Sequence, residues 1–107
     1  MPRTQTQTQT QDQVYGAVDT PEDIRTINGK IRAQMERAES RDELTELKKR
    51  SDYLCALARA PSWKAKLGRN LDAVQRTARD ENRKSTDVAN RVAERHGWDA
   101  DYDAWGK

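Results

Sequence analysis

The side chains best suited to nucleophilic or acid–base chemistry in this 107-residue chain are its single cysteine, Cys55, and its single histidine, His96. Cys55 stands beside an apolar stripe, where a buried thiol is unreactive. His96 falls in the last turn of a predicted helix, where a cation favours the negative end of the helix dipole. Neither paired carboxylates in an apolar setting nor a glycine-rich phosphate loop accompanies them. We therefore predict that the protein is not an enzyme and that it uses no cofactor.

Carboxylates recur at alternate positions close to the end of the sequence, at Asp99, Asp101 and Asp103. This spacing copies the first ligands of a calcium-binding loop, which also requires a glycine at its sixth position and a glutamate at its twelfth. Ala104 occupies the sixth position, and the twelfth falls after Lys107. Because this loop cannot be completed, we predict no metal site.

Three aromatic residues are interspersed with these aspartates: Trp98, Tyr102 and Trp105. Separated by four and then three residues, they would share one face of a helical turn. Aromatic side chains with this spacing dock into grooves on partner proteins, but they can equally cap a core that is short of apolar area. We expect residues 98–107 to cap part of the core and to leave at least one tail tryptophan exposed for a partner protein.

Basic side chains gather in the second half of the chain, where residues 48–95 carry 13 Lys or Arg against 6 Asp or Glu. Residues 1–47 carry 6 against 9. Four arginines fall within about 80° of each other on the helix predicted after Pro61, at about 100° per residue. This face either follows phosphates without reading bases or is the solvated side of a surface helix. The residues of this candidate site for nucleic acid or an acidic partner are Arg69, Arg76, Arg79, Arg83, Lys48, Lys49 and Arg50.

The elements that position these residues are predicted to be helices. Apolar residues recur at spacings of three and four throughout residues 20–97, which indicates an all-α domain. Hydrophobic residues make up 34% of the chain and charged residues 36%, so the core is expected to be thin, with a stability of only a few kcal/mol. The predicted fold is a small bundle of three to four helices.

Two helices are predicted between residues 20 and 60. Thr20 can cap the first of them, with Pro21 in its first position, and Ser40 with Glu43 forms a capping box at the start of the second. Their apolar stripes do not join on one straight helix, so we predict an antiparallel hairpin, with one long helix over 21–60 in an oligomer as the alternative. Tyr53 adds a second apolar face, which is typical of a central helix.

Two further helices are predicted beyond Pro61. The first carries a stripe that begins at Trp63 and passes a break near Gly68. The second is capped by Ser85 or Thr86 and stops at Gly97. The chain thus divides into a low-complexity, flexible Gln/Thr arm over 1–19, a helical domain over 20–97 and an aromatic–acidic segment over 98–107.

The totals point to binding rather than chemistry. No apolar run approaches the roughly 20 residues that span a bilayer, no signal peptide is present, and a lone cysteine excludes an internal disulfide, so we expect a cytoplasmic protein. The leading hypothesis is a small interaction protein, an adaptor or inhibitor that covers a partner protein, by analogy with accessory proteins of phages or plasmids. The alternatives are a nucleic-acid-binding protein that uses the arginine face, and a homo-oligomeric scaffold.

If the nucleic-acid alternative holds, replacing Arg76, Arg79 and Arg83 with alanine is expected to weaken binding similarly for all sequences. The slope of affinity against salt should also become shallower, because fewer phosphates are neutralised. Filter binding or fluorescence anisotropy at several salt concentrations measures both effects. A wild-type protein that binds no duplex and no single strand at low salt contradicts this alternative.

Overall fold

The computed structural model describes residues 18–105. In this range the chain forms helices and no strand, which confirms the prediction of an all-α fold. The predicted arm lies outside the described residues, except for Val18 and Asp19. The elements are α2 (Pro21–Glu36), α3 (Arg41–Ala58), α4 (Pro61–Leu67), the short 3-10 helix η1 (Gly68–Asn70) and α5 (Leu71–His96).

The predicted capping residues, Thr20 and Ser40, are found at the starts of α2 and α3. The side chain of Thr20 accepts a hydrogen bond from the backbone N–H of Asp23, and the Asp23 carboxylate accepts from the N–H groups of Asp19 and Thr20. These bonds lower the pKa of the Asp23 carboxyl group. At the start of α3, Ser40 Oγ accepts from the N–H of Glu43 at 3.1 Å, but the Glu43 carboxylate accepts from the N–H of Glu39 at 3.0 Å rather than from that of Ser40, so Ser40 caps the helix without the predicted reciprocal bond. Residues 37–40 are not helical, so α2 and α3 are separate helices.

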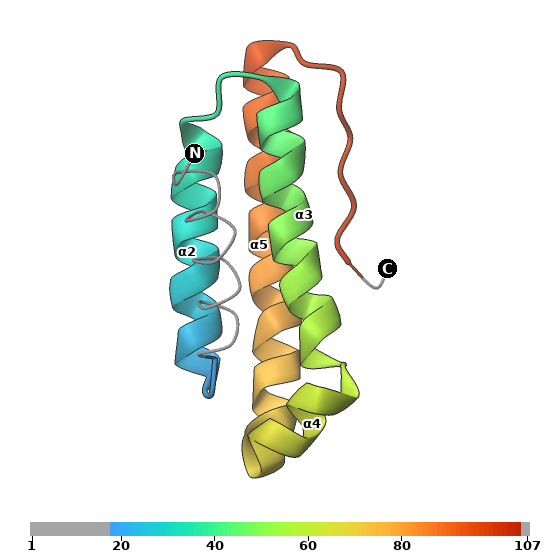
Figure 1. Ribbon diagram of the computed structural model, residues 1–107. Coiled ribbons are helices and arrows are strands. Elements are labelled where there is room, and N and C mark those ends of the chain that lie inside the picture. Colours follow the sequence, from blue (N-terminus) through green and yellow to red (C-terminus); the bar gives the residue numbers. More distant parts are fainter. Residues whose placement is uncertain (1–17, 106–107) are drawn as a thin grey trace, which may run out of the picture.

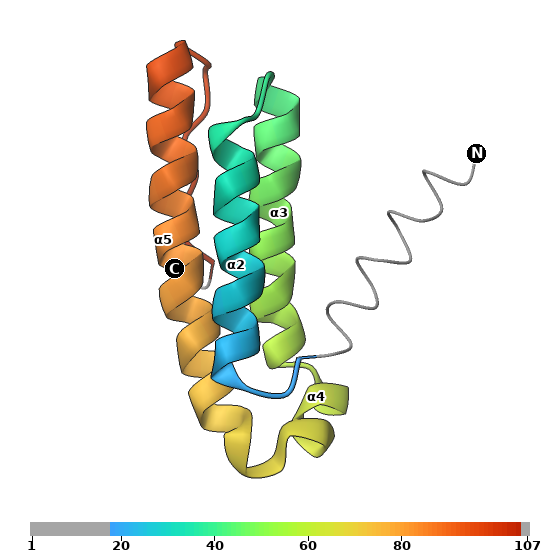
Figure 2. The same ribbon diagram turned by 90° about the vertical axis from the view of Figure 1, so that its left-hand side faces the viewer.

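The three long helices lie side by side, and each runs in the opposite direction to the one before it (Figure 1). α4 and η1 close the lower end of the bundle between α3 and α5. Beyond α5 the chain turns back and runs along α3 and α5 on the side away from α2, as Figures 1 and 2 both show. α3 and α5 therefore form a layer that is covered by α2 on one face and by the C-terminal segment on the other.

The predicted helix start at Ser85 or Thr86 is wrong, because α5 continues without a break from Leu71 to His96. Both residues lie in the middle of α5, and their side chains are buried in the bundle. The Ser85 hydroxyl donates to Asn28 Oδ1 of α2 at 3.1 Å, and the Thr86 hydroxyl donates to the carbonyl of Asn82 one turn earlier at 2.8 Å. These hydroxyls therefore have partners that need no helix end.

The second apolar face predicted for α3 is not buried. Tyr53 is 50% exposed and Leu57 is half-buried. Each of the three long helices packs against the other two, and α5, rather than α3, makes the most extensive contacts.

The core consists of two apolar clusters, one toward each end of the bundle, and the predicted stripes supply them. The lower cluster in Figure 1 includes Trp63, the one fully buried aromatic residue of the described chain. The buried members of the lower cluster are Val18, Ile24, Leu54, Cys55, Ala58, Trp63, Leu67, Val74 and Ala78. The buried members of the upper cluster are Ile31, Met35, Ala38, Leu44, Leu47, Ala89, Val92 and Ala93.

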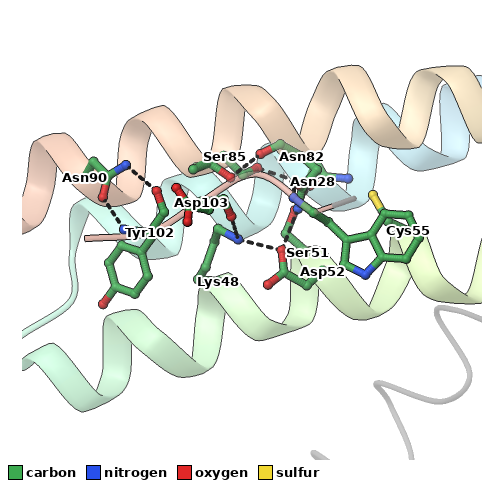
Figure 3. Close-up of polar contacts among 12 residues, drawn as sticks. Asn28, Lys48, Ser51, Asp52, Cys55, Asn82, Ser85, Asn90, Tyr102 and Asp103 are labelled. Atoms are coloured by element: carbon green, nitrogen blue, oxygen red, sulfur yellow. Dashed lines mark hydrogen bonds and ion pairs between the residues drawn. The ribbon is translucent and has the colours of Figure 1, made fainter. Parts of the chain in front are cut away.

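A layer of four buried polar side chains, which we call the polar layer, separates the two clusters along all three long helices: Asn28, Ser51, Asn82 and Ser85. Asn28 Oδ1 accepts from Ser51 Oγ at 2.8 Å and from Ser85 Oγ at 3.1 Å. Asn82 Nδ2 donates to Ser51 Oγ at 2.9 Å (Figure 3). Because buried polar groups are costly without partners, the polar layer holds α2, α3 and α5 at one level relative to each other.

Ile31→Asp tests the packing of α2. Ile31 is 5% exposed within the upper cluster, so a carboxylate there is expected to lower the free energy of unfolding by at least about 3 kcal/mol. In a domain of this size that loss leaves little helix at room temperature. Thermal melting followed by circular dichroism measures it. The control is Ala33→Asp, which adds the same charge at an exposed position of the same helix; equal melting of the two variants contradicts the described packing.

Candidate peptide-binding groove

The C-terminal segment, residues 98–105 and here called the tail, is extended. Residues 98–104 have no helical structure, so the predicted helical face of aromatic residues is wrong. Alternate residues instead face the helices: Trp98, Ala100 and Tyr102 are half-buried, whereas Asp99 and Asp101 between them are exposed. This period of two is typical of an extended chain, and the alternation of aspartates was the sequence signal for it.

The tail begins at a sharp reversal of the chain after α5. Gly97 has a φ of 73°, in the left-handed region that favours glycine. Its N–H donates to Glu94 O at 3.1 Å, and the N–H of Trp98 donates to Ala93 O at 2.9 Å, which is the hydrogen-bond pattern of a Schellman motif. The reversal sends the tail back along the length of α5.

Asn90 of α5 holds the middle of the tail by its main chain. Its Oδ1 accepts from the N–H of Tyr102 at 2.7 Å, and its Nδ2 donates to the carbonyl of the same residue at 2.8 Å (Figure 3). One side-chain amide thus pairs with both polar groups of one residue, as a neighbouring strand would. Such pairing recognises an extended backbone and is indifferent to the side chain attached to it.

Three further side chains bind tail main-chain groups on either side of this pair. Asn82 Oδ1 accepts from the N–H of Trp105 at 2.8 Å. Lys48 Nζ donates to the carbonyl of Asp103 at 2.8 Å, and Arg41 donates to the carbonyl of Asp99 at 3.0 Å. The side chains of α3 and α5 therefore line a groove, here called the α3–α5 groove, whose polar groups match an extended chain.

The aromatic side chains of the tail pack against both apolar clusters. Trp98 and Tyr102 lie on the upper cluster, and Trp105 lies on the lower one. Trp98 also stacks on the His96 ring, with 4.3 Å between ring centroids, and the Tyr102 hydroxyl lies 2.8 Å from Thr45 Oγ1. The Arg59 guanidinium sits 5.3 Å from the centroid of the Trp105 ring, within range of a cation–π contact.

The tail covers part of both apolar clusters without supplying a buried residue to either. Every fully buried residue of the described chain lies between Val18 and Ala93, and the tail aromatics are only half-buried. Neither tail tryptophan stands fully exposed, contrary to the expectation from the sequence. The tail is thus an outer layer on the α3–α5 side of the bundle, held by hydrogen bonds to its main chain and by half-buried aromatic side chains.

Lys48, Lys49 and Arg50, which were predicted to extend the arginine face, have different surroundings in the structure. Lys48 is 4% exposed, with its ammonium 2.6 Å from Asp52 Oδ1 and bound to the tail. Lys49 is exposed and pairs with Glu46 within α3, and Arg50 is half-buried.

The predicted arginines lie at the surface, but acidic residues share their side of α5. Arg69 belongs to η1, whereas Arg76, Arg79 and Arg83 follow one another on α5, and all four are exposed. Arg76 forms an ion pair with Asp72. The exposed residues Asp72, Asp80 and Asp87 alternate with the arginines along this side, at about 100° per residue. The surface is therefore of mixed charge, and nucleic-acid binding stays a prediction.

The structure keeps the two groups considered for nucleophilic chemistry apart. The Cys55 thiol donates to Ala78 O at 3.2 Å inside the lower cluster, and burial raises its pKa to about 11. His96 ends α5, about 27 Å along the helix from Ala78 at 1.5 Å per residue. Cys55 is thus held as the neutral thiol, far from the histidine.

Asn82 and Asn90 are the site residues that sequence analysis missed. Asparagine is a poor residue in the interior of a helix, and both stand on the packed side of α5, one buried and one half-buried. An asparagine at such a position needs a partner, which is the signal that points to them. The tail supplies a partner to each.

Two other kinds of site can be addressed for residues 18–105. Within that range no group of three or more His, Cys, Asp or Glu side chains is arranged to hold a metal ion, and none of its helices combines the length and apolarity needed to cross a membrane.

Comparison with models of protein families, with curated proteins and with solved structures gives no match to this chain.

Asn90→Ala is expected to release the middle of the tail, because both main-chain hydrogen bonds of Tyr102 disappear. The backbone amide of Tyr102 should lose protection in hydrogen exchange followed by NMR, and the free energy of unfolding should fall by about 1–2 kcal/mol. The control is Arg91→Ala, which removes an exposed ion pair with Glu36 worth less than about 1 kcal/mol and should leave Tyr102 protected. Full protection in Asn90→Ala shows that the tail does not depend on this side chain.

Proposed function

We propose that this chain is a non-enzymatic interaction protein, an adaptor or inhibitor that captures an extended segment of a partner protein in the α3–α5 groove. Its own tail fills the groove until that segment arrives. The observation that carries the proposal is the binding of the tail mainly through its main chain, by side chains that belong to the folded bundle.

The weak burial of the tail supports a reversible role. Burial of a half-buried aromatic side chain contributes less to stability than the roughly 1.5–3 kcal/mol of a fully buried one. None of the buried residues of the described chain belongs to the tail. We therefore expect the bundle to remain folded when the tail is released, because the hydrogen bonds among Asn28, Ser51 and Ser85 do not involve the tail.

The floor of the groove supports the same conclusion. Where the tail lies over α3 and α5 at the level of the polar layer, the groups beneath it are Lys48, Asp52 and Asn82 (Figure 3). Charged and amide groups at this level can be hydrated when the tail leaves, whereas on either side of it the tail aromatics cover the two apolar clusters. An exchangeable ligand needs a groove that tolerates water between occupants.

Occlusion is the mechanism that this geometry offers. A partner segment that lies in the groove has its main-chain groups paired and one side covered by α3 and α5, so it is withheld from other proteins. This mechanism requires no nucleophile, and burial holds the Cys55 thiol in its neutral form.

The test uses the full-length variant Tyr102→Ala/Trp105→Ala, in which the tail is weakened and the groove is intact. A fluorescent peptide of residues 98–107 should bind this variant with a Kd on the order of 10–100 µM. The wild-type protein should bind it at least about tenfold more weakly, because a tethered tail competes at an effective concentration on the order of 1 mM. Fluorescence anisotropy measures both affinities.

The matched control adds Asn90→Ala to the same variant and should remove most of the binding. Helical content and hydrogen exchange of α5 amides establish that each protein is folded. A folded receptor that shows no saturable binding, or binding that is unchanged by Asn90→Ala, rules the proposal out. An excess of peptide added to the wild-type protein gives an independent reading, since it should deprotect the Tyr102 amide of the chain's own tail.

A further inference from the structure

We infer that the α3–α5 groove selects extended protein segments that carry two aromatic residues three positions apart, and that it disregards the side chains at the positions of Asp99 and Asp101. This inference rests on the proposed function and specifies its ligand. The class is a segment of a partner protein with the pattern aromatic–x–x–aromatic, where the first aromatic residue takes the place of Tyr102 and the second that of Trp105.

Main-chain contacts set the conformation that the groove accepts. Between residues 99 and 105, hydrogen bonds reach one N–H and one C=O of Tyr102, the carbonyls of Asp99 and Asp103, and the N–H of Trp105. These groups are present in any sequence except where proline removes an N–H. The spacing of the bound groups fits an extended chain, so a helical segment cannot satisfy them.

The two aromatic anchors set the register of the ligand. Tyr102 packs on the upper cluster and its hydroxyl pairs with Thr45. Trp105 packs on the lower cluster beneath Arg59. The anchors therefore lie on either side of the polar layer, and a shift of the ligand by one residue removes both from the clusters that they contact.

The exposed aspartates contribute little to recognition. Asp99 and Asp101 are exposed, and within residues 18–105 their carboxylates form neither a hydrogen bond nor an ion pair. Acidic character is thus not required at these positions of a ligand.

Synthetic peptides based on residues 98–107 test this inference, with the full-length Tyr102→Ala/Trp105→Ala protein as the receptor and anisotropy competition as the measurement. N-methylation of the Tyr102 amide should weaken binding at least about tenfold, because it removes the hydrogen bond to Asn90. N-methylation of the Asp101 amide, which has no hydrogen-bond partner among residues 18–105, is the matched control and should change affinity by less than about threefold. A peptide with Asp99→Ser and Asp101→Ser should also bind within about threefold of the parent.

A receptor that also carries Asn90→Ala tests whether the loss of affinity comes from the hydrogen bond between the Tyr102 amide and Asn90. On that receptor, N-methylation of Tyr102 should cost no further affinity, since the acceptor is already gone. Equal effects of N-methylation at Tyr102 and Asp101, or a tenfold loss with the serine peptide, overturn the inference. If the parent peptide binds in those cases, the proposed function stands and only the rule of selection fails; if the parent peptide does not bind, the proposed function fails.

The intact wild-type chain provides a measurement that needs no weakened receptor. Asp99→Ser/Asp101→Ser in the full-length protein should leave the Tyr102 amide as protected from hydrogen exchange as before. Loss of that protection shows that the aspartates hold the tail and contradicts the inference.

Discussion

The buried hydrogen bonds of the polar layer are the constraint on which the rest of this structure depends. An apolar cluster tolerates sliding, because one leucine contact can replace another, but Asn28, Ser51 and Ser85 have partners at one level only. Moving one helix by a turn leaves several of these groups unpaired in an apolar setting, at about 1–3 kcal/mol for each. In a chain with so little apolar area, this penalty decides the register of the bundle.

Asn82 carries that constraint outward to the groove. Its Nδ2 donates inward to Ser51 and to Asp52, and this fixes which way the amide points. Its Oδ1 is consequently presented to the N–H of Trp105. Lys48 plays a similar part, since its ion pair with Asp52 orients an ammonium toward the carbonyl of Asp103. The groove is thus organised by contacts inside the bundle before any segment occupies it.

The sequence was sufficient for those features that depend on neighbours along the chain. Apolar spacing located the helices, and Thr20 and Ser40 marked two of their starts. The sequence was misleading where a residue of another helix determines the structure. Ser85 is of a type that often caps helices, but its hydroxyl donates a hydrogen bond to Asn28 of α2.

The tail shows the same limit. The spacing of Trp98 and Tyr102 suits both a helix and an extended chain, and the choice between them is made by Asn90, which offers a strand-like pair of hydrogen bonds. Lys48 looked like part of a surface patch because its burial depends on a backbone carbonyl that closes over it. Moreover, an extended chain that uses one edge to bind leaves the other open to pairing with any passing strand. The charges of the exposed Asp99 and Asp101 oppose the pairing of a second strand with the tail. These two residues therefore protect the molecule against aggregation through this edge.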